Sequence, residues 1–180
     1  YEEHPYPRWI AMPPIEIQPL SIVMKGYFPF RDFDKSGDSG PIEVLVAGCG
    51  TGQHPLSVAV QNSNVLAVDL SLSSLAYAQR KAQEMKVKNI SFAQADILKL
   101  TSPDKKFDVI ECCGVLHHLG KPIEGWRILT NLLKPGGFMK IGLYSELARQ
   151  PVVEARRLIS EWGVLPTNEG IRNCRERFKR

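Results

Sequence analysis

Three glycines, at positions 48, 50 and 52, alternate with other residues directly after the apolar run at 44–47. A short apolar, β-branched run is typical of a buried strand, and glycines after it indicate a tight turn where the backbone approaches something closely. The residues after the turn predict a helix. A strand, a glycine-rich turn and a helix in this order form the nucleotide site of α/β proteins, at the carboxyl end of the first strand.

Aspartates follow the next two strands that the sequence predicts. Asp69 follows the first of them, where a carboxylate can accept hydrogen bonds from both hydroxyls of a ribose. Asp96 follows the second, where it can accept from the exocyclic amine of an adenine, and Leu70 and Ile97 beside these acids could enclose the base. Each aspartate alone is equally well explained as a helix cap. Together with the glycine turn, the two aspartates favour a site for a nucleoside.

The spacing of the glycines separates two kinds of nucleotide site. A dinucleotide-binding turn has the pattern G-x-G-x-x-G. Gln53 stands where that pattern has its last glycine, and Gly52 comes one residue early. The spacing therefore disfavours a NAD-dependent oxidoreductase, which ranks third behind the two hypotheses given at the end of this section.

A series of motifs, taken in chain order, resembles the class I S-adenosylmethionine-dependent methyltransferases over about residues 42–145. The motifs are Gly48-Cys49-Gly50-Thr51-Gly52, Val68-Asp69, Gln94-Ala95-Asp96, Phe107-Asp108-Val109-Ile110, Val115-Leu116-His117-His118-Leu119 and Leu133-Lys134-Pro135-Gly136-Gly137. The resemblance implies S-adenosylmethionine as cofactor and S-adenosylhomocysteine as product, with the glycine turn under the methionine part. It also places Cys112 and Cys113 beside the cofactor. The cofactor-binding residues expected are Gly48, Cys49, Gly50, Gly52, Asp69, Leu70, Asp96, Ile97 and Cys112.

Catalysis by such an enzyme demands little from side chains. Methyl transfer from a sulfonium is an in-line displacement, so the enzyme mainly aligns the reactants and excludes water. A general base is needed only when the acceptor must lose a proton. His117 and His118, after the fourth predicted strand, are the candidate catalytic residues, although packing or capping is the stronger explanation for each. The neighbouring cysteines are better explained by packing than by nucleophilic catalysis.

Two features depart from the family pattern. The family has an acid two residues before the first glycine, where Val46 stands, so contacts to the methionine ammonium must come from elsewhere. The family also adds two strands after the fifth, whereas residues 146–180 look helical. The sheet therefore lacks these strands, or the chain is truncated before them. Because an exposed sheet edge is a liability, we expect that two chains could pair there as a homodimer.

Strand and helix patterns alternate along the chain, which predicts an α/β, Rossmann-like, doubly wound and mostly parallel sheet with helices on both faces. We expect an N-terminal arm at 1–40, a cofactor-binding core at 41–145 and a C-terminal helical segment at 146–180. The strands expected lie at 42–47, 65–68, 90–93, from 107 and at 138–143, and the helices at 53–61, 72–85, 122–133, 146–162 and 167–178.

The N-terminal arm is rich in proline and aromatic residues, which favours an extended, anchored segment over a disordered one. Residues 34–40 then predict a loop before the core. As a lid, Tyr6, Arg8 and Trp9 would fold over the cofactor; as a linker, the arm would only tether a neighbouring domain. Residues 1–9 and 47–55 look like a subgroup of the family found C-terminal to tetratricopeptide repeats. This resemblance implies a repeat region in the parent chain. No 34-residue helical repeat lies in these 180 residues.

Composition narrows the remaining possibilities. The net charge is +4, and the basic residues at the C-terminus are best explained as a solvated helix end, because no nucleic-acid motif accompanies them. No apolar run is long enough to cross a membrane and no signal peptide is evident. Taken with the absence of a nucleic-acid motif, this leaves a methyl acceptor as the expected partner, rather than nucleic acid or a membrane. The four cysteines show no zinc spacing, so we expect no metal and a reducing, cytoplasmic setting.

Two hypotheses of different classes remain. The first is a methyltransferase that acts on a small molecule or a protein side chain. The second is a catalytically weak or inactive module, cut from a longer repeat-containing protein, that keeps the fold and the cofactor site. The glycine turn and both aspartates favour the first hypothesis, whereas Val46 and the missing strands favour the second.

Overall fold

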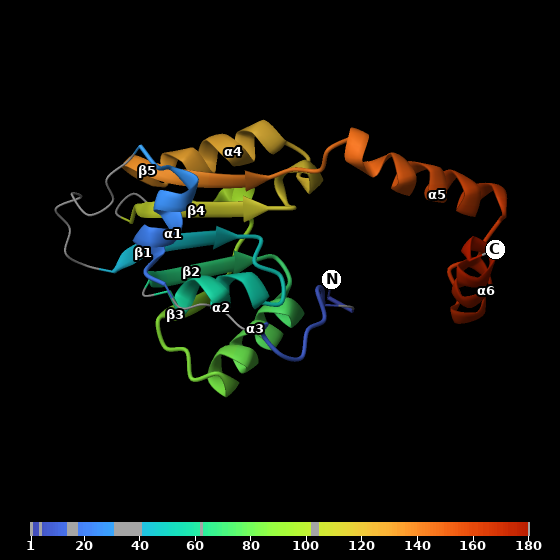
Figure 1. Ribbon diagram of the computed structural model, residues 1–180, viewed down its shortest axis with the longest axis horizontal. Helices are drawn as coiled ribbons and strands as arrows, with labels where there is room; N and C mark the ends of the chain where they lie inside the picture. The colour runs from blue at the N-terminus through green and yellow to red at the C-terminus, as the bar shows by residue number, and fades with distance from the viewer. Residues whose placement is uncertain are drawn as a thin grey trace. The chain divides into compact units, whose positions relative to one another are not determined.

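A five-stranded parallel sheet forms the centre of the unit Tyr1–Leu143 (Figure 1). The computed structural model describes residues 2–3, 5–13, 18–30, 41–61, 63–101 and 105–179. All neighbouring strands are parallel, so their carboxyl ends meet at one edge of the sheet. This confirms the α/β, Rossmann-like architecture. The strands are β1 (Ile42–Ala47), β2 (Ser63–Asp69), β3 (Ile90–Gln94), β4 (Phe107–Cys113) and β5 (Leu133–Gly142), in the order β3-β2-β1-β4-β5.

Helices cover both faces of this sheet. On one face lie α1 (Leu20–Tyr27), α2 (Gln53–Ala59) and α3 (Leu72–Glu84), whose apolar residues share a core with Val44 and Val46. On the other face lie α4 (Pro122–Asn131) and the short 3₁₀ helices η1 (Ile97–Lys99) and η2 (Leu116–His118), which share a second core with Leu45 and Ala47. Because successive side chains of a strand point to opposite faces, β1 supplies both cores and must be apolar throughout its second half.

Several element boundaries differ from those that the sequence predicts, two of them by more than two residues. Strand β5 begins at Leu133 rather than at 138, and its pairing with β4 is irregular between Phe107 and Val109. Helix α4 ends at Asn131, before the Pro-Gly-Gly run, and that run lies inside β5 rather than between the helix and the strand. The long helix expected at 146–162 is a 3₁₀ turn, η3 (Leu147–Arg149), followed by α5 (Gln150–Glu161). Proline near the start of α5 lacks an N–H and suits a first turn, which explains the new start.

The N-terminal arm is anchored to the core where the structure describes it. Trp9 is buried against Leu56 and Ala82, and its indole Nε1 donates a hydrogen bond to the backbone oxygen of Thr51 at 3.0 Å. Helix α1 is an eight-residue element that begins directly after Pro19, so the prolines shorten the helix without excluding it. The loop predicted at 34–40 lies outside the described residues.

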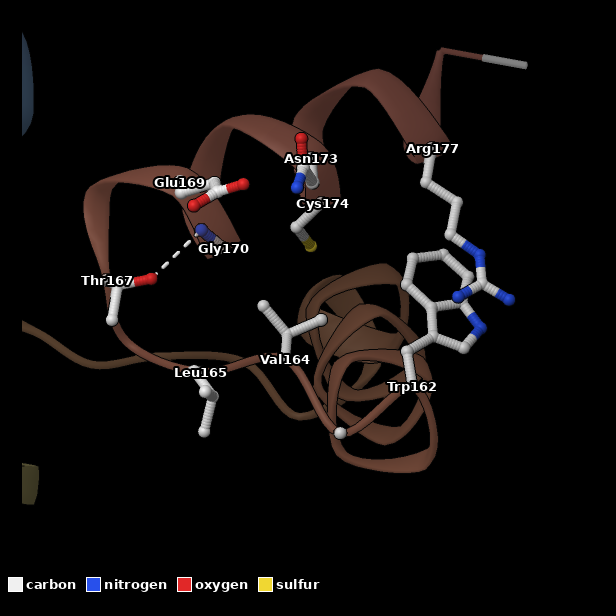
Figure 2. Close-up of a pocket in the computed structure, with 10 residues that line it drawn as sticks. Trp162, Val164, Leu165, Thr167, Glu169, Gly170, Asn173, Cys174 and Arg177 are labelled. Carbon is white, nitrogen blue, oxygen red and sulfur yellow. Dashed lines mark hydrogen bonds between the residues drawn. The ribbon is translucent and has the colours of Figure 1, made fainter.

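Residues Tyr144–Arg180 form a separate compact unit, and Tyr1–Leu143 form the other. The C-terminal unit holds α5 and α6 (Asn168–Phe178), and its described residues contain no strand. Thr167 caps α6 as predicted, since its hydroxyl accepts from the backbone N–H of Gly170 at 3.0 Å (Figure 2). The Arg177 guanidinium lies 3.9 Å from the centre of the Trp162 ring, and both residues line a cavity of about 350 Å³. Figure 2 shows these two side chains stacked on one another.

Candidate functional site

The glycine turn between β1 and α2 has a left-handed backbone at each of its three glycines. Gly48, Gly50 and Gly52 have φ values of 79°, 53° and 85°, in the left-handed region that L side chains rarely adopt. A Cβ on Gly52 would lie 2.5 Å from the Cβ of Ala78 in α3, and a Cβ on Gly50 would lie 2.8 Å from the backbone oxygen of Tyr6. The turn therefore lets its own backbone approach both α3 and the N-terminal arm.

Asp69 and the glycine turn meet, as their positions in the sequence predict. One carboxylate oxygen, Oδ2, accepts from the backbone N–H of Gly50 at 2.7 Å, and the other, Oδ1, accepts from that of Ser71 at 3.0 Å. The backbone N–H groups of Gly48 and Cys49 also donate to the oxygen of Val68. These bonds fix the ends of β1 and β2 against one another and hold a partly buried carboxylate at the carboxyl edge of the sheet.

Asp96 lies at the end of the neighbouring strand. Its Oδ1 accepts from the backbone N–H of Leu98 at 2.9 Å, so it caps η1. The backbone N–H of Ala95 donates to the oxygen of Asp69, which ties the two acidic strand ends together. The two residues expected to enclose a base differ in exposure: Leu70 is 60% exposed, whereas Ile97 is 4% exposed and packs in the core with α4.

The end of β4 supplies the remaining predicted residues. Cys112 and Cys49 are buried, and burial raises the pKa of Cys112 to about 11 and that of Cys49 to about 12. Such thiols are poor nucleophiles at neutral pH, which agrees with a packing role. His117 and His118 follow in η2, with ring centroids 4.2 Å apart; the first is half-buried and the second is exposed.

A carboxylate that the motifs do not identify lies beside this edge. Glu111 of β4 is 8% exposed, and its Oε2 contacts Nε2 of His54 in the first turn of α2. Its Oε1 lies 3.7 Å from Nζ of Lys140 on β5. Burial raises the pKa of Glu111. The hydrogen bond and charge of His54 and the charge of Lys140 lower it by more, so the pKa of Glu111 lies below its usual value. One signal could have found it, namely an acid between the apolar residues Ile110 and Cys112 of the strand.

Described residues of the N-terminal arm contact the glycine turn at the same edge. The hydroxyl of Thr51 donates to the backbone oxygen of Pro7, and Trp9 donates back to Thr51. The carboxylate of Glu2 accepts from the backbone N–H groups of Leu72 and Ser73, at 2.8 and 3.3 Å, at the start of α3. A carboxylate at a helix N-terminus is favoured by the helix dipole. Glu2 is thus held at the start of α3, three residues after Asp69 at the end of β2.

Two possible features are absent from the described part of the chain. Its His, Cys, Asp and Glu residues form no group of three or more that could hold a metal ion. Its helices are all too short or too polar to cross a membrane.

Comparisons with known proteins agree on one family. Residues 44–137 match the profile of the methyltransferase domain family. The chain is 36% identical to an uncharacterized protein of Synechococcus over 67% of the chain and 30% of that protein. It is 29% identical to a ubiquinone biosynthesis O-methyltransferase of Acinetobacter baumannii, over 66% of the chain and 49% of that enzyme. An S-adenosylmethionine-dependent methyltransferase of Clostridium acetobutylicum is similar in structure, with 27% identity, a TM-score of 0.50, and coverage of 65% of this chain and 53% of that one. The chain thus spans 30–53% of the length of these relatives.

Proposed function

Because the chain belongs to the methyltransferase domain family, we propose that it binds S-adenosylmethionine at the carboxyl edge of the sheet and transfers its methyl group to an acceptor. One observation carries this proposal: the glycine turn and Asp69 meet at that edge, joined by the 2.7 Å hydrogen bond from Gly50 to Asp69. Open sheets of this kind bind their ligands outside the carboxyl ends of the strands. A turn with three glycines, beside an acid, fits a nucleoside with a flexible chain attached.

Each predicted cofactor residue has a role in this proposal. The glycines at 48, 50 and 52 allow the methionine part to lie against bare backbone, next to Cys49 and Cys112. Asp69 binds the ribose hydroxyls, because a carboxylate has about four acceptor positions and its two bonds to backbone N–H groups leave capacity. Asp96 accepts from the adenine amine, with Leu70 and Ile97 beside the base.

The chemistry asks the chain mainly for alignment. When bound, S-adenosylmethionine supplies an electrophilic methyl group on a sulfonium, and S-adenosylhomocysteine is left after transfer. The turn and the two aspartates would fix the nucleoside, and the arm held by Glu2 and Trp9 would exclude water from it. His117 or His118 would accept a proton from an acceptor that must lose one. The acceptor is a small molecule or a protein side chain, and the O-methyltransferase relative makes hydroxyl compounds the first class to screen.

A second function is favoured by one residue. Val46 occupies the position where the family pattern has an acid, which supports a module that binds the cofactor without turnover. The tetratricopeptide-repeat subgroup, the homodimer and the cytoplasmic location stay predictions. Sedimentation at micromolar concentrations would test the homodimer, and a monomer there would argue against pairing of the sheet edges.

Calorimetric titration tests the cofactor proposal directly. We expect S-adenosylmethionine and S-adenosylhomocysteine to bind and NAD not to bind. Asp69→Asn should weaken binding of both by about tenfold or more, because it removes a charge-assisted hydrogen bond to the ribose. Asp108→Asn is the matched control, since this carboxylate lies at the other end of β4 and pairs with Lys134. Binding of NAD instead, or no binding of S-adenosylmethionine, would overturn the proposal. If S-adenosylmethionine binds, an assay of methyl transfer to hydroxyl acceptors distinguishes an active enzyme from a module that binds the cofactor without turnover.

A further inference from the structure

The pairing register brings Glu111 next to the position that lacks an acid. Val46 of β1 pairs with Glu111 of β4, and Glu111 pairs in turn with Lys140 of β5. Residues that pair in this way point to the same face of a sheet, and neighbouring strands are about 4.8 Å apart. Glu111 therefore presents a carboxylate one strand away from Val46, at the same level and on the same face. Gly48 begins the glycine turn two residues after Val46.

The partners of Glu111 make it more than a buried acid. His54, from the first turn of α2, holds one carboxylate oxygen, and Lys140 approaches the other at 3.7 Å. The side chain of Glu111 is 11% exposed, whereas those of His54 and Lys140 are 47% and 46% exposed. A carboxylate fixed close to the edge of the sheet thus stands beside an ammonium group that solvent reaches. Lys140 is half-exposed and its contact with Glu111 is long, so its ammonium group can turn toward another anion while His54 keeps Glu111 paired.

The cluster has the charges that an amino-acid zwitterion requires. An α-ammonium needs an anionic acceptor, and an α-carboxylate beside it needs a cationic donor; Glu111 and Lys140 supply one of each, side by side. We propose, resting on the cofactor site proposed above, that Glu111 binds the α-ammonium group of the methionine part of the cofactor and that Lys140 binds its α-carboxylate. The acid absent at Val46 is replaced by one on the adjacent strand.

The same two strands supply a matched control pair at their other end. Asp108 of β4 and Lys134 of β5 form an ion pair with a distance of 3.0 Å. Asp108 also accepts from the backbone N–H of Glu43, near the start of β1. This pair has the same chemistry and lies on the same strands, but it lies at the edge of the sheet away from the glycine turn.

Three ligands separate the two contacts when titrated into the whole chain. S-adenosylhomocysteine has both charged groups, decarboxylated S-adenosylhomocysteine keeps only the ammonium, and 5′-methylthioadenosine has neither. Glu111→Gln should weaken the first two by about ten- to a hundredfold, the range for a hydrogen bond between charged groups, and leave the third within about twofold. Lys140→Gln should weaken only the first. Asp108→Asn and Lys134→Gln should change none of the three.

The outcomes distinguish the inference from the function on which it rests. If the unaltered chain bound none of the three ligands, the proposed cofactor site would fail, and the inference with it. If it bound them but Glu111→Gln weakened all three equally, or none, the ammonium contact would be refuted while the cofactor site stood. Loss of S-adenosylhomocysteine alone in Lys140→Gln, with 5′-methylthioadenosine retained as a check of folding, supports the second contact. Equal loss of every ligand in that variant would refute it.

Discussion

Replacing Gly52 by alanine tests how closely the glycine turn must approach α3. The new Cβ would lie 2.5 Å from the Cβ of Ala78 and 3.0 Å from its Cα, and neither atom can move without moving the helix. The backbone of Gly52 also has a φ of 85°. The substitution therefore combines two costs, a steric overlap and a backbone conformation that L residues avoid.

Both costs can be estimated, and the chain offers controls that separate them. The left-handed conformation costs an L residue about 1–2 kcal/mol, and overpacking costs about 1–3 kcal/mol. We expect Gly52→Ala to lower the free energy of unfolding by about 2–5 kcal/mol in total. Gly114 has a φ of 76° but no atom within 4 Å of a built Cβ, so Gly114→Ala should show the conformational cost alone. Gly120→Ala, with open space and no positive φ, should be nearly neutral.

Urea unfolding followed by far-UV circular dichroism measures these differences, provided that the dependence on urea is equal in all variants. The double variant Gly52→Ala/Ala78→Gly should recover part of the overlap cost, with a coupling energy of about 1–3 kcal/mol in the double-mutant cycle. A loss for Gly52→Ala no larger than that for Gly114→Ala would refute the reasoning, because it would show that α3 does not press on the turn. Absence of coupling to Ala78 would refute it as well.

Two further predictions concern titratable groups. At pH 8, iodoacetamide should modify the exposed Cys113 before the buried Cys49 and Cys112. The thiol of Cys49, with a pKa of about 12, is only about one part in 10⁴ ionised at that pH. Labelling of Cys49 as fast as that of Cys113 in the folded chain, measured by mass spectrometry, would contradict this. The lowered pKa of Glu111 means that its ion pairs stabilise the fold above its usual value of 4.5 and lose that contribution as the pH falls below it. The free energy of unfolding should therefore drop more between pH 7 and about pH 3.5 in the unaltered chain than in Glu111→Gln, and equal drops would contradict the assignment.

Much of the candidate site was predictable because its signals are local. The glycine turn follows an apolar strand, and the aspartates end the next two strands, so simple patterns place all of them at strand ends. Alternation of strands and helices then predicts a parallel sheet, and a parallel sheet gathers those ends at one edge. The hydrogen bond from Gly50 to Asp69 shows that the glycine turn and the first aspartate do meet at that edge. Element boundaries were less predictable, as β5 shows: the proline and glycines expected to separate it from α4 lie inside the strand.

The contacts of Glu111 and Trp9 could not be predicted in the same way. Trp9 contacts Thr51, 42 residues away, and His54 contacts Glu111, 57 residues away. Which strand neighbours which, and in what register, depends on how the whole sheet packs, because a shift of one residue would turn every side chain to the other face. The sequence by itself determined the residue types at the strand ends, through patterns that span a few residues. Only the tertiary structure decided that a β4 carboxylate stands beside Val46, since that depends on the pairing of β1 with β4.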